Sequence, residues 1–479
     1  MHLGFVLDQG ACIGCHACTV ACKAENDVPL GAFRTWVKWV EHGSFPDTRR
    51  SAAVLRCNHC ADAPCIEICP TKALHKRADG IVDLDRDRCI GCASCLQACP
   101  YDAIYIDERV GTAAKCHFCA HRIEVGLAPA CVAVCPEQAI KVVDFDDPVT
   151  RAELSRRGAV ARKPERRTRP RTLYLGADPA TLDPLRVDGT RTLSHAEVPD
   201  PLPAPGNADA RAIYDVPRKR QWGAAIAGYM TTKAVASGAL LGAALSPWVP
   251  ALDPVLLGWT SLVALLVTTA LLIGDLHKPL RFLFLLTRPN TGSWLVRGGW
   301  ILIAHGALSV PWALGLAGRV EGGPLPALDP ALLGLAGPLP ASWLAALSAP
   351  VAIFTAIYTA FLFWQARGRE LWSEDRLLIG ALLLQATAST AALAWLLGVR
   401  GPLLLGSLAA YPAILLVATW LKPPTAQARL AHRLMVKHPA YAAGLVAAVG
   451  AVLFPPLMLV AFFLLDWIYL RAGQQVALS

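Results

Sequence analysis

The 479-residue sequence predicts two fold classes joined end to end: an α+β head and an all-α bundle of membrane-spanning helices. All sixteen cysteines fall between Cys12 and Cys135, whereas long apolar segments occur only after Trp222. Hydrophobic residues make up 54% of the chain and charged residues only 17%. A soluble globular chain carries about a quarter charged residues. The composition therefore excludes a disordered or fibrous chain and argues against an ordinary soluble enzyme.

We divide the chain into a head (residues 1–145), a connector (146–220) and a membrane region (221–475). Residues 1–10 lack the basic segment, twin-arginine pair and apolar core of a secretion signal, so we expect no export. The connector carries a basic run and a proline-rich stretch, which together favour an extended linker lying on a partner subunit or on anionic lipid. Nucleic-acid binding is not expected. The residues concerned are Arg156, Arg157, Arg162, Lys163, Arg166, Arg167, Arg169 and Arg171, followed by Pro199, Pro201, Pro203 and Pro205.

The cysteines form four groups. They are Cys12, Cys15, Cys18 and Cys22; Cys57, Cys60, Cys65 and Cys69; Cys89, Cys92, Cys95 and Cys99; and Cys116, Cys119, Cys131 and Cys135. The first and third groups have the C-x2-C-x2-C-x3-C spacing of bacterial ferredoxins, and the other two have longer inserts. Proline follows the final cysteine in three groups, while Lys23 follows Cys22.

This spacing is typical of cubane iron–sulfur clusters. Three thiolates come from one loop, and in two-cluster ferredoxins the fourth cysteine of each run binds the neighbouring cluster. Disulfides require an oxidising compartment, and zinc explains paired C-x2-C units but not the third cysteine with its trailing Cys-Pro. Sixteen thiolates at four per cluster predict four [4Fe–4S] clusters.

The second and third groups are only 20 residues apart (Cys69 to Cys89), so we expect them to form one ferredoxin unit and the outer groups to form another. The predicted ligand sets are Cys57, Cys60, Cys65 and Cys99; Cys89, Cys92, Cys95 and Cys69; Cys12, Cys15, Cys18 and Cys135; and Cys116, Cys119, Cys131 and Cys22. Four clusters in a row would carry electrons, with no substrate chemistry of their own.

The head resembles the four-cluster subunits of the dimethyl sulfoxide reductase and polysulfide reductase families over nearly all of residues 5–145. The motifs are CIGCHACTVACKAEN, CNHCADAPCIEICP, CIGCASCLQACP and CHFCAHRI…CVAVCP. This resemblance implies a ferredoxin-like fold and a catalytic partner subunit with a molybdopterin or tungstopterin cofactor. The membrane region resembles NrfD/PsrC-type quinone-binding subunits in WGAAIAGYMTTKAVASGALL and GDLHKPLRFLFLLTRPNTGSWLVRGGW. That resemblance implies exchange with menaquinone or ubiquinone. Fusion of the two parts departs from most such systems.

A membrane span needs about 20 apolar residues. Hydropathy predicts spans near 222–246, 254–275, 294–318, 341–366, 376–399 and 402–421. Pro455 and Pro456 interrupt a further stretch, 439–471, which predicts either one kinked span or a half-helix followed by a span. The count is seven, with eight left open.

Polar residues inside spans are costly and usually face a cavity or a partner. If the spans adjoin, a pocket for quinone and protons would lie beneath the clusters, lined by Tyr229, Lys233, Asp275, His277, His305, Tyr358 and Gln385. The alternatives are that Lys233 snorkels or pairs with Asp275, and that His305 only packs. Because His305 is the one histidine inside a span, we expect no bis-histidine haem.

The predicted function is an electron-transfer and membrane-anchor subunit of a quinone-linked pterin oxidoreductase complex. Quinone chemistry would occur on this chain and the substrate site on a partner, so no catalytic residue is assigned here. The alternatives are a hydrogenase or multihaem cytochrome partner, or a redox-coupled proton-translocating module. Against the last, only Asp466 among the carboxylates lies deep in a span.

Basic residues flanking the spans predict a multi-pass cell-membrane protein with a cytoplasmic head, since positive charge gathers on the cytoplasmic side. Fourteen lie on the head side and three (Arg319, Arg400, Arg471) opposite. The fourteen are Arg218, Lys219, Arg220, Lys278, Arg281, Arg288, Arg297, Arg367, Arg369, Arg376, Lys422, Arg429, Arg433 and Lys437.

Overall fold

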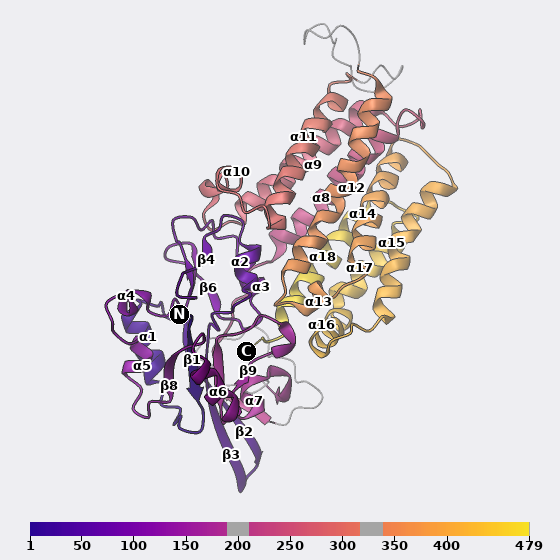
Figure 1. Cartoon of the computed structure of the whole chain (residues 1–479). Helices are drawn as coiled ribbons and strands as arrows, with labels where there is room; N and C mark the ends of the chain where they lie inside the picture. Colours follow the sequence, from indigo (N-terminus) through magenta and orange to yellow (C-terminus); the bar gives the residue numbers. More distant parts are fainter. Residues whose placement is uncertain (189–209, 317–338, 479) are drawn as a thin grey trace.

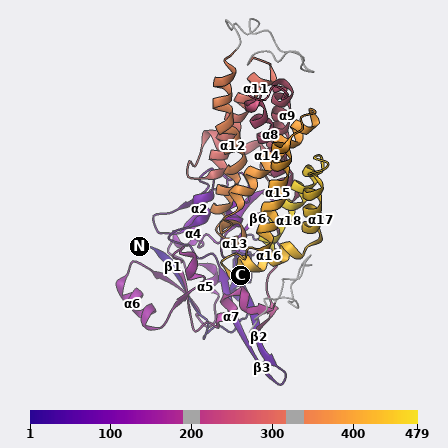
Figure 2. The same cartoon turned by 90° about the vertical axis from the view of Figure 1, so that its right-hand side faces the viewer.

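The computed structural model describes residues 1–188, 210–316 and 339–478. A head of short strands and helices lies at one end of a long helical bundle, and both views show this arrangement (Figures 1 and 2). The α+β head and the all-α membrane part predicted from the sequence are both confirmed.

Two four-stranded sheets frame the head. The first has the order β8–β1–β10–β9, and β1 pairs parallel to β10 and antiparallel to β8. Its strands are β1 (Leu3–Asp8), β8 (Ile140–Asp144), β9 (Val160–Ala161) and β10 (Thr172–Leu175). The second has the order β11–β12–β2–β3, with strands β2 (Thr35–Ser44), β3 (Asp47–Arg56), β11 (Val187–Asp188) and β12 (Ala210–Tyr214). The β2–β3 hairpin projects from the head on the side away from the bundle (Figure 1).

The cysteine loops lie between short helices and hairpins. Helix α2 (Pro64–Ile68) packs on α3 (Ser94–Ala98), and α1 (Ala17–Glu25) packs on α5 (Ala130–Ala133). The remaining elements are β4 (Leu74–Lys76), β5 (Val82–Leu84), β6 (Ile104–Asp107), β7 (Thr112–Lys115) and α4 (Ala120–Ile123). The helices of the second and third cysteine groups thus form one unit, and those of the first and fourth groups form another.

The expected extended connector is wrong for residues 148–188 and 210–214, which belong to the head. They form α6 (Pro148–Arg156), α7 (Pro179–Leu182) and strands β9 to β12, because mostly buried segments such as Thr172–Leu175 pair with other strands of the head. The basic run is not a free arm either. Arg162 is buried and donates to the Leu478 carbonyl (3.2 Å), Arg169 pairs with Asp62, and Arg166 pairs with Glu370. The proline-rich stretch at 199–205 lies outside the described residues.

The described residues of the bundle contain eight apolar helices, of which α17 is the shortest at 12 residues, and several further helices. The long helices are α8 (Ala224–Leu245), α9 (Pro254–Gly274), α11 (Trp294–Ala313), α12 (Ala341–Gln365), α14 (Leu378–Leu396), α15 (Pro402–Trp420), α17 (Pro439–Gly450) and α18 (Leu457–Gln475). The short ones are α10 (Phe284–Thr287), α13 (Glu370–Ser373) and α16 (Ala426–Lys437). Five are long and apolar enough to cross a membrane: α9, α12, α14, α15 and α18. Helices α8 and α11 have 22 and 20 residues but carry Lys233 and Arg297.

The last apolar stretch is a helical hairpin and not a single kinked span. Pro456 caps the start of α18, where proline's missing N–H is tolerated, so the chain turns back between α17 and α18. Helix α18 ends at the head, because the Gln474 amide donates to the Trp222 carbonyl (2.7 Å). Arg471 therefore lies on the head side, which corrects its predicted place on the opposite side.

Backbone carbonyls of the cysteine loops bind the head to the bundle. The Trp222 indole donates to the Cys92 carbonyl (3.3 Å), the Asn290 amide to the Cys69 carbonyl (2.8 Å) and the Ser293 hydroxyl to the Ile68 carbonyl (2.8 Å). Gly91 has a φ of +70°, and a side chain there would meet the Cβ of His277 at 2.7 Å. The third cysteine loop thus lies directly against the α9–α10 loop of the membrane region.

Candidate functional site

Two cavities in the head are each lined by four cysteines from two distant groups. One is lined by Cys12, Cys15, Cys18 and Cys135, and the other by Cys22, Cys116, Cys119 and Cys131. In the other half of the head, Cys65 interacts electrostatically with Cys57, Cys60 and Cys99. Cys95 likewise interacts with Cys69, Cys89 and Cys92. The fourth cysteine of each group therefore lies with the three cysteines of its partner group.

The thiols have the surroundings that cluster ligands need. All sixteen cysteines are free thiols. Backbone N–H groups of Ala139, Ala113 and Leu74 donate to the sulfurs of Cys135 (3.3 Å), Cys89 (3.4 Å) and Cys69 (3.5 Å). No three His, Cys, Asp or Glu side chains of the described residues converge on a single metal ion. Since a cubane holds its four cysteines around a volume of iron and sulfide, the four-cysteine cavities fit a cluster better than a lone ion.

Buried cations lie beside the thiols of both halves of the head. The fully buried Arg56 donates to the Cys131 sulfur (3.2 Å), and the Lys115 amine lies 3.8 Å from the Cys57 sulfur. Burial raises the pKa of Cys60 and of Cys92 to about 12 each. These thiols are thus protonated at neutral pH in the absence of metal. A cluster bound there would have to displace those protons, and the neighbouring cations would then offset the thiolate charge.

The seven membrane residues predicted to share one pocket lie in separate places. Tyr229, Lys233 and Tyr358 lie together, with Thr359 between them. Gln385 bonds to Asp466, whose charge also interacts with Lys233. His305 is buried among α9, α11 and α12, where its ring nitrogens contact Ser261 and Thr355 (2.9 Å each). Asp275 and His277 lie at the head-side end of α9, where His277 contacts the third cysteine loop.

A row of hydrogen bonds joins Lys233, Thr359, Tyr229 and Tyr358. Lys233, 1% exposed, donates to the Thr359 hydroxyl (2.7 Å) and to the Ala356 carbonyl (2.7 Å), so it neither snorkels nor pairs with Asp275. Tyr229 donates to the Tyr358 hydroxyl (2.8 Å) and lies 2.7 Å from the Thr359 oxygen. Because each hydroxyl has one proton, Thr359 donates to Tyr229. The row therefore runs Lys233, Thr359, Tyr229, Tyr358.

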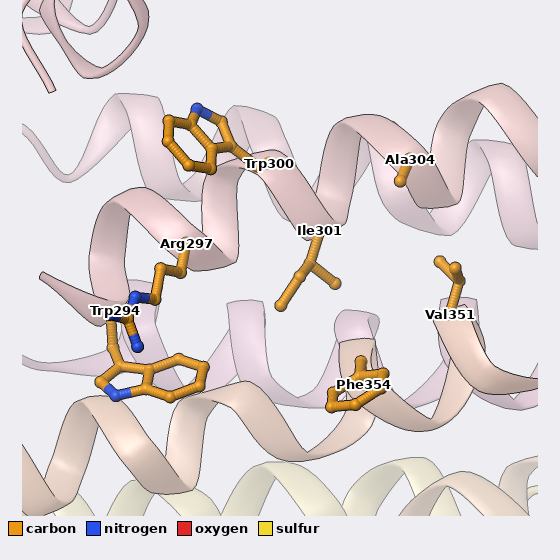
Figure 3. Close-up of a pocket in the computed structure, with 7 residues that line it drawn as sticks. All are labelled: Trp294, Arg297, Trp300, Ile301, Ala304, Val351 and Phe354. Atoms are coloured by element: carbon orange, nitrogen blue, oxygen red, sulfur yellow. The ribbon is translucent and has the colours of Figure 1, made fainter. Parts of the chain in front are cut away.

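An apolar groove lies between α11 and α12 near this row. In Figure 3 Ile301 of α11 points across toward Phe354 and Val351 of α12. Trp294 lies at the head-side end, with the Arg297 guanidinium 4.9 Å from its ring. Trp300 and Ala304 complete the lining. Sequence reasoning missed this groove, although Trp294, Arg297 and Trp300 recur at three-residue spacing within a motif singled out above.

Gly298 of α11 packs against the end of the row. It follows Arg297 on α11, and a Cβ added there would lie 2.3 Å from the ring of Tyr358. The glycine thus allows the Tyr358 ring to pack against the backbone of α11. Sequence reasoning also missed Thr359, although its spacing from Thr355 places two hydroxyls on one face of α12.

Comparison with known proteins agrees with this geometry. Residues 52–145 match a 4Fe-4S dicluster domain, and residues 215–460 match the family described as "Polysulphide reductase, NrfD". A tetrathionate reductase subunit of Salmonella typhimurium is 45% identical over 186 residues, which are 38% of this chain and 74% of that protein. A polysulfide reductase component of Wolinella succinogenes is 42% identical over 149 residues, 30% of this chain and 78% of that protein. The iron–sulfur subunit of arsenate respiratory reductase from Shewanella is 33% identical over 230 residues, 36% of this chain and 96% of that protein.

The fold, the cysteine loops and these matches define an iron–sulfur, membrane-embedded subunit of the oxidoreductase class. The NrfD match covers more than half of the sequence, and the protein belongs to the polysulphide reductase NrfD family. The resemblance seen in the sequence is thereby confirmed for both halves.

Replacing Gly298 by alanine should disturb Tyr358, because the added methyl group overlaps its ring. We expect a loss of about 1–3 kcal/mol in stability, measured as a lower unfolding temperature in detergent. Gly299→Ala is the matched control on the same helix, since a Cβ there meets nothing within 4 Å. Equal unfolding temperatures for the two variants would contradict the packing described here.

Proposed function

We propose that this chain carries electrons between a catalytic partner and membrane quinone through four [4Fe–4S] clusters, and anchors the complex in the membrane. The contact between the Cys69 and Cys92 loops and the membrane helices carries the proposal. A cluster held there is the nearest of the four to the bundle. A cluster in the cavity of Cys12, Cys15, Cys18 and Cys135 lies in the part of the head built from α1 and α5, away from the bundle (Figure 1).

The partner is proposed to be a catalytic subunit with a molybdopterin or tungstopterin cofactor. Similarity to proteins named as parts of tetrathionate, polysulfide and arsenate reductases supports it. Metal analysis of the complex copurified with the chain tests this assignment. Molybdenum or tungsten would support it, whereas nickel or covalent haem would indicate the hydrogenase or cytochrome alternative.

We propose the four predicted cysteine sets as the cluster ligands. Each set takes three cysteines from one loop and the fourth from its partner loop, as in two-cluster ferredoxins. The cavities lined by four cysteines and the electrostatic neighbours of Cys65 and Cys95 support this crossed arrangement. When bound, the clusters supply one-electron redox chemistry, and Arg56 and Lys115 would favour their reduced, more negative states.

Iron content tests crossed ligation. The intact chain should contain about sixteen irons. A Cys65→Ala/Cys99→Ala double variant should lose one cluster, about four irons, because both residues serve the same cluster. Cys95→Ala/Cys99→Ala should lose two clusters, about eight irons, although both residues lie in one loop. The reverse result, measured by iron analysis and electron paramagnetic resonance, would show that each loop binds its own cluster.

We propose that quinone reacts beside Tyr358 and reaches it along the groove between α11 and α12. The apolar lining suits an isoprenoid chain, and the row of hydroxyls ending at Tyr358 suits a quinone carbonyl. Asp275 and His277 are proposed as proton-exchanging groups at the membrane edge. The roles predicted for His305 and Gln385 at the quinone stay predictions, because both residues lie apart from the Tyr358 row. No haem is required, since the clusters at the head–membrane contact are proposed to reduce quinone directly.

Tyr358→Phe should slow quinone turnover about 10–100-fold by removing a proton donor, while reduction of the clusters by dithionite stays unchanged. Tyr441→Phe is the matched control, because Tyr441 is also buried and hydrogen-bonded, to Thr419 (2.7 Å), on α17. Steady-state assays with soluble menaquinone and ubiquinone analogues measure the effect. Wild-type protein that exchanged no electrons with either analogue would overturn the proposed function.

We propose eight membrane passes: six by α8, α9, α11, α12, α14 and α15, and two by the α17–α18 hairpin. Both ends of this hairpin lie on the head side, so Arg471 joins the fourteen basic residues already assigned there. Only Arg319, outside the described residues, and Arg400 are left opposite. This fifteen-to-two distribution, counted from the residues named above, supports a cytoplasmic head in a multi-pass cell-membrane protein.

Protease treatment of oriented vesicles tests the sidedness. We expect cleavage within residues 146–220 in inverted vesicles, where a cytoplasmic head faces the medium, and protection in right-side-out vesicles. A protease site inserted beside Arg400, in the loop between α14 and α15, serves as the control and should give the opposite pattern. Cleavage of residues 146–220 in right-side-out vesicles alone would place the head outside.

A further inference from the structure

Lys233 has a buried acidic neighbour that belongs neither to the row of hydrogen bonds ending at Tyr358 nor to the head. Its two hydrogen bonds go to neutral oxygens, and the carboxylate with which it interacts electrostatically is Asp466 of α18. Asp466 lies nine residues from the start of α18 and nine from its end, hence near the middle of the bundle. A charge at that depth is unfavourable unless it is paired or protonated.

The surroundings of Asp466 leave acceptor atoms without donors. One carboxylate oxygen accepts from the Gln385 amide (3.0 Å), which also donates to the Tyr411 hydroxyl (3.1 Å). The second oxygen of Asp466 and the amide oxygen of Gln385 have no hydrogen-bond partner among the described residues. Asp466 is 6% exposed and Gln385 3% exposed. Buried acceptors left without a donor are unfavourable, and a proton on the carboxyl group removes part of this penalty.

The other titratable groups around Asp466 are tyrosines. Asp466 interacts electrostatically with Tyr229 of α8, Tyr411 of α15 and Tyr469 of α18. From α14, the neutral Gln385 contacts it through a hydrogen bond. Lys233 is the cation that shares this interior with Asp466 in the described part of the bundle. An amine and a carboxyl group thus lie in the same interior, on the packed helices α8 and α18, next to hydroxyls that lead to Tyr358.

We propose that Asp466 is the proton-exchanging partner of Lys233, and that the two residues supply protons to the quinone reaction and accept them from it. This inference rests on the proposed quinone function. Asp466 lies outside residues 215–460, the part that matches the NrfD family, so the carboxyl group comes from a segment beyond the match.

The step balances as follows in the direction of quinone reduction. Two electrons come from the clusters, and two protons form the two O–H bonds of the quinol. Each proton leaves the Tyr358 hydroxyl and is replaced in turn from Tyr229, Thr359 and Lys233. Asp466 then returns a proton to Lys233 through a bridging water, because no hydrogen bond or ion pair among the described residues joins the two side chains directly. Water outside the membrane reprotonates Asp466. Quinol oxidation reverses each transfer and passes two electrons to the clusters.

The test is quinone turnover by the complete complex in vesicles, with a soluble menaquinone or ubiquinone analogue. Asp466→Asn keeps the size of the side chain but cannot exchange a proton. We expect turnover to fall about 100-fold, while the half-saturating quinone concentration and dithionite reduction of the clusters stay unchanged. Asp466→Glu should restore most of the rate. Asp253→Asn, which retains a capping side chain at the start of α9, is the control and should match the wild type.

A second variant covers the case in which Asp466→Asn does not assemble, because it leaves Lys233 without its counter-charge. Lys233→Met/Asp466→Leu removes both charges and keeps apolar volume, and it should also be slow. Wild-type turnover in either variant, or a glutamate variant as slow as the asparagine variant, would overturn the proton role. Absence of quinone turnover in the wild type would instead overturn the proposed function on which the inference rests.

Discussion

The hydrogen bonds between cysteine-loop carbonyls and membrane side chains fix the relation between the two halves of the molecule. The carbonyls of Cys92 and Cys69 accept from Trp222 and Asn290, residues at the head-side ends of α8 and α11. These carbonyls belong to cysteines of the loops themselves, so the positions of two membrane helices are tied to the geometry of the cysteine loops.

Much of the head could be predicted from the sequence because cysteine spacing is a local signal with a strict geometric cause. Three thiols within a few residues, followed by a fourth, leave little choice of chemistry, and the short separation of Cys69 and Cys89 indicated which loops pair. The connector was mispredicted for the opposite reason. The pairing of Thr172 with Phe5 joins strands far apart in the chain, and no local pattern in a basic segment reveals such a partner.

The same contrast applies within the membrane region. Apolar length alone predicted the six earlier helices of the bundle, and four of them, α9, α12, α14 and α15, are long and apolar enough to cross a membrane. The double proline at 455–456 suits either a kink or a helix start, and only packing against the head decides between them. Lys233, Tyr229 and Tyr358 could be selected because charged and phenolic side chains are rare inside spans. Their grouping with Thr359, and the separation of His305, depend on how α8, α11 and α12 rotate about their axes, which hydropathy does not encode.

Residues 476–478 close the head, and this has a consequence for the timing of biogenesis. The Leu478 amide donates to Asp102, a residue 376 positions earlier in the chain, and the Leu478 carbonyl accepts from the buried Arg162. At about 5–20 residues per second, a ribosome needs roughly 20–75 seconds to cover that separation. During this interval Asp102 and Arg162 lack their partner Leu478, while the membrane helices are synthesised one after another. These contacts between the two ends of the chain can therefore form only after the last helix, α18, has been made.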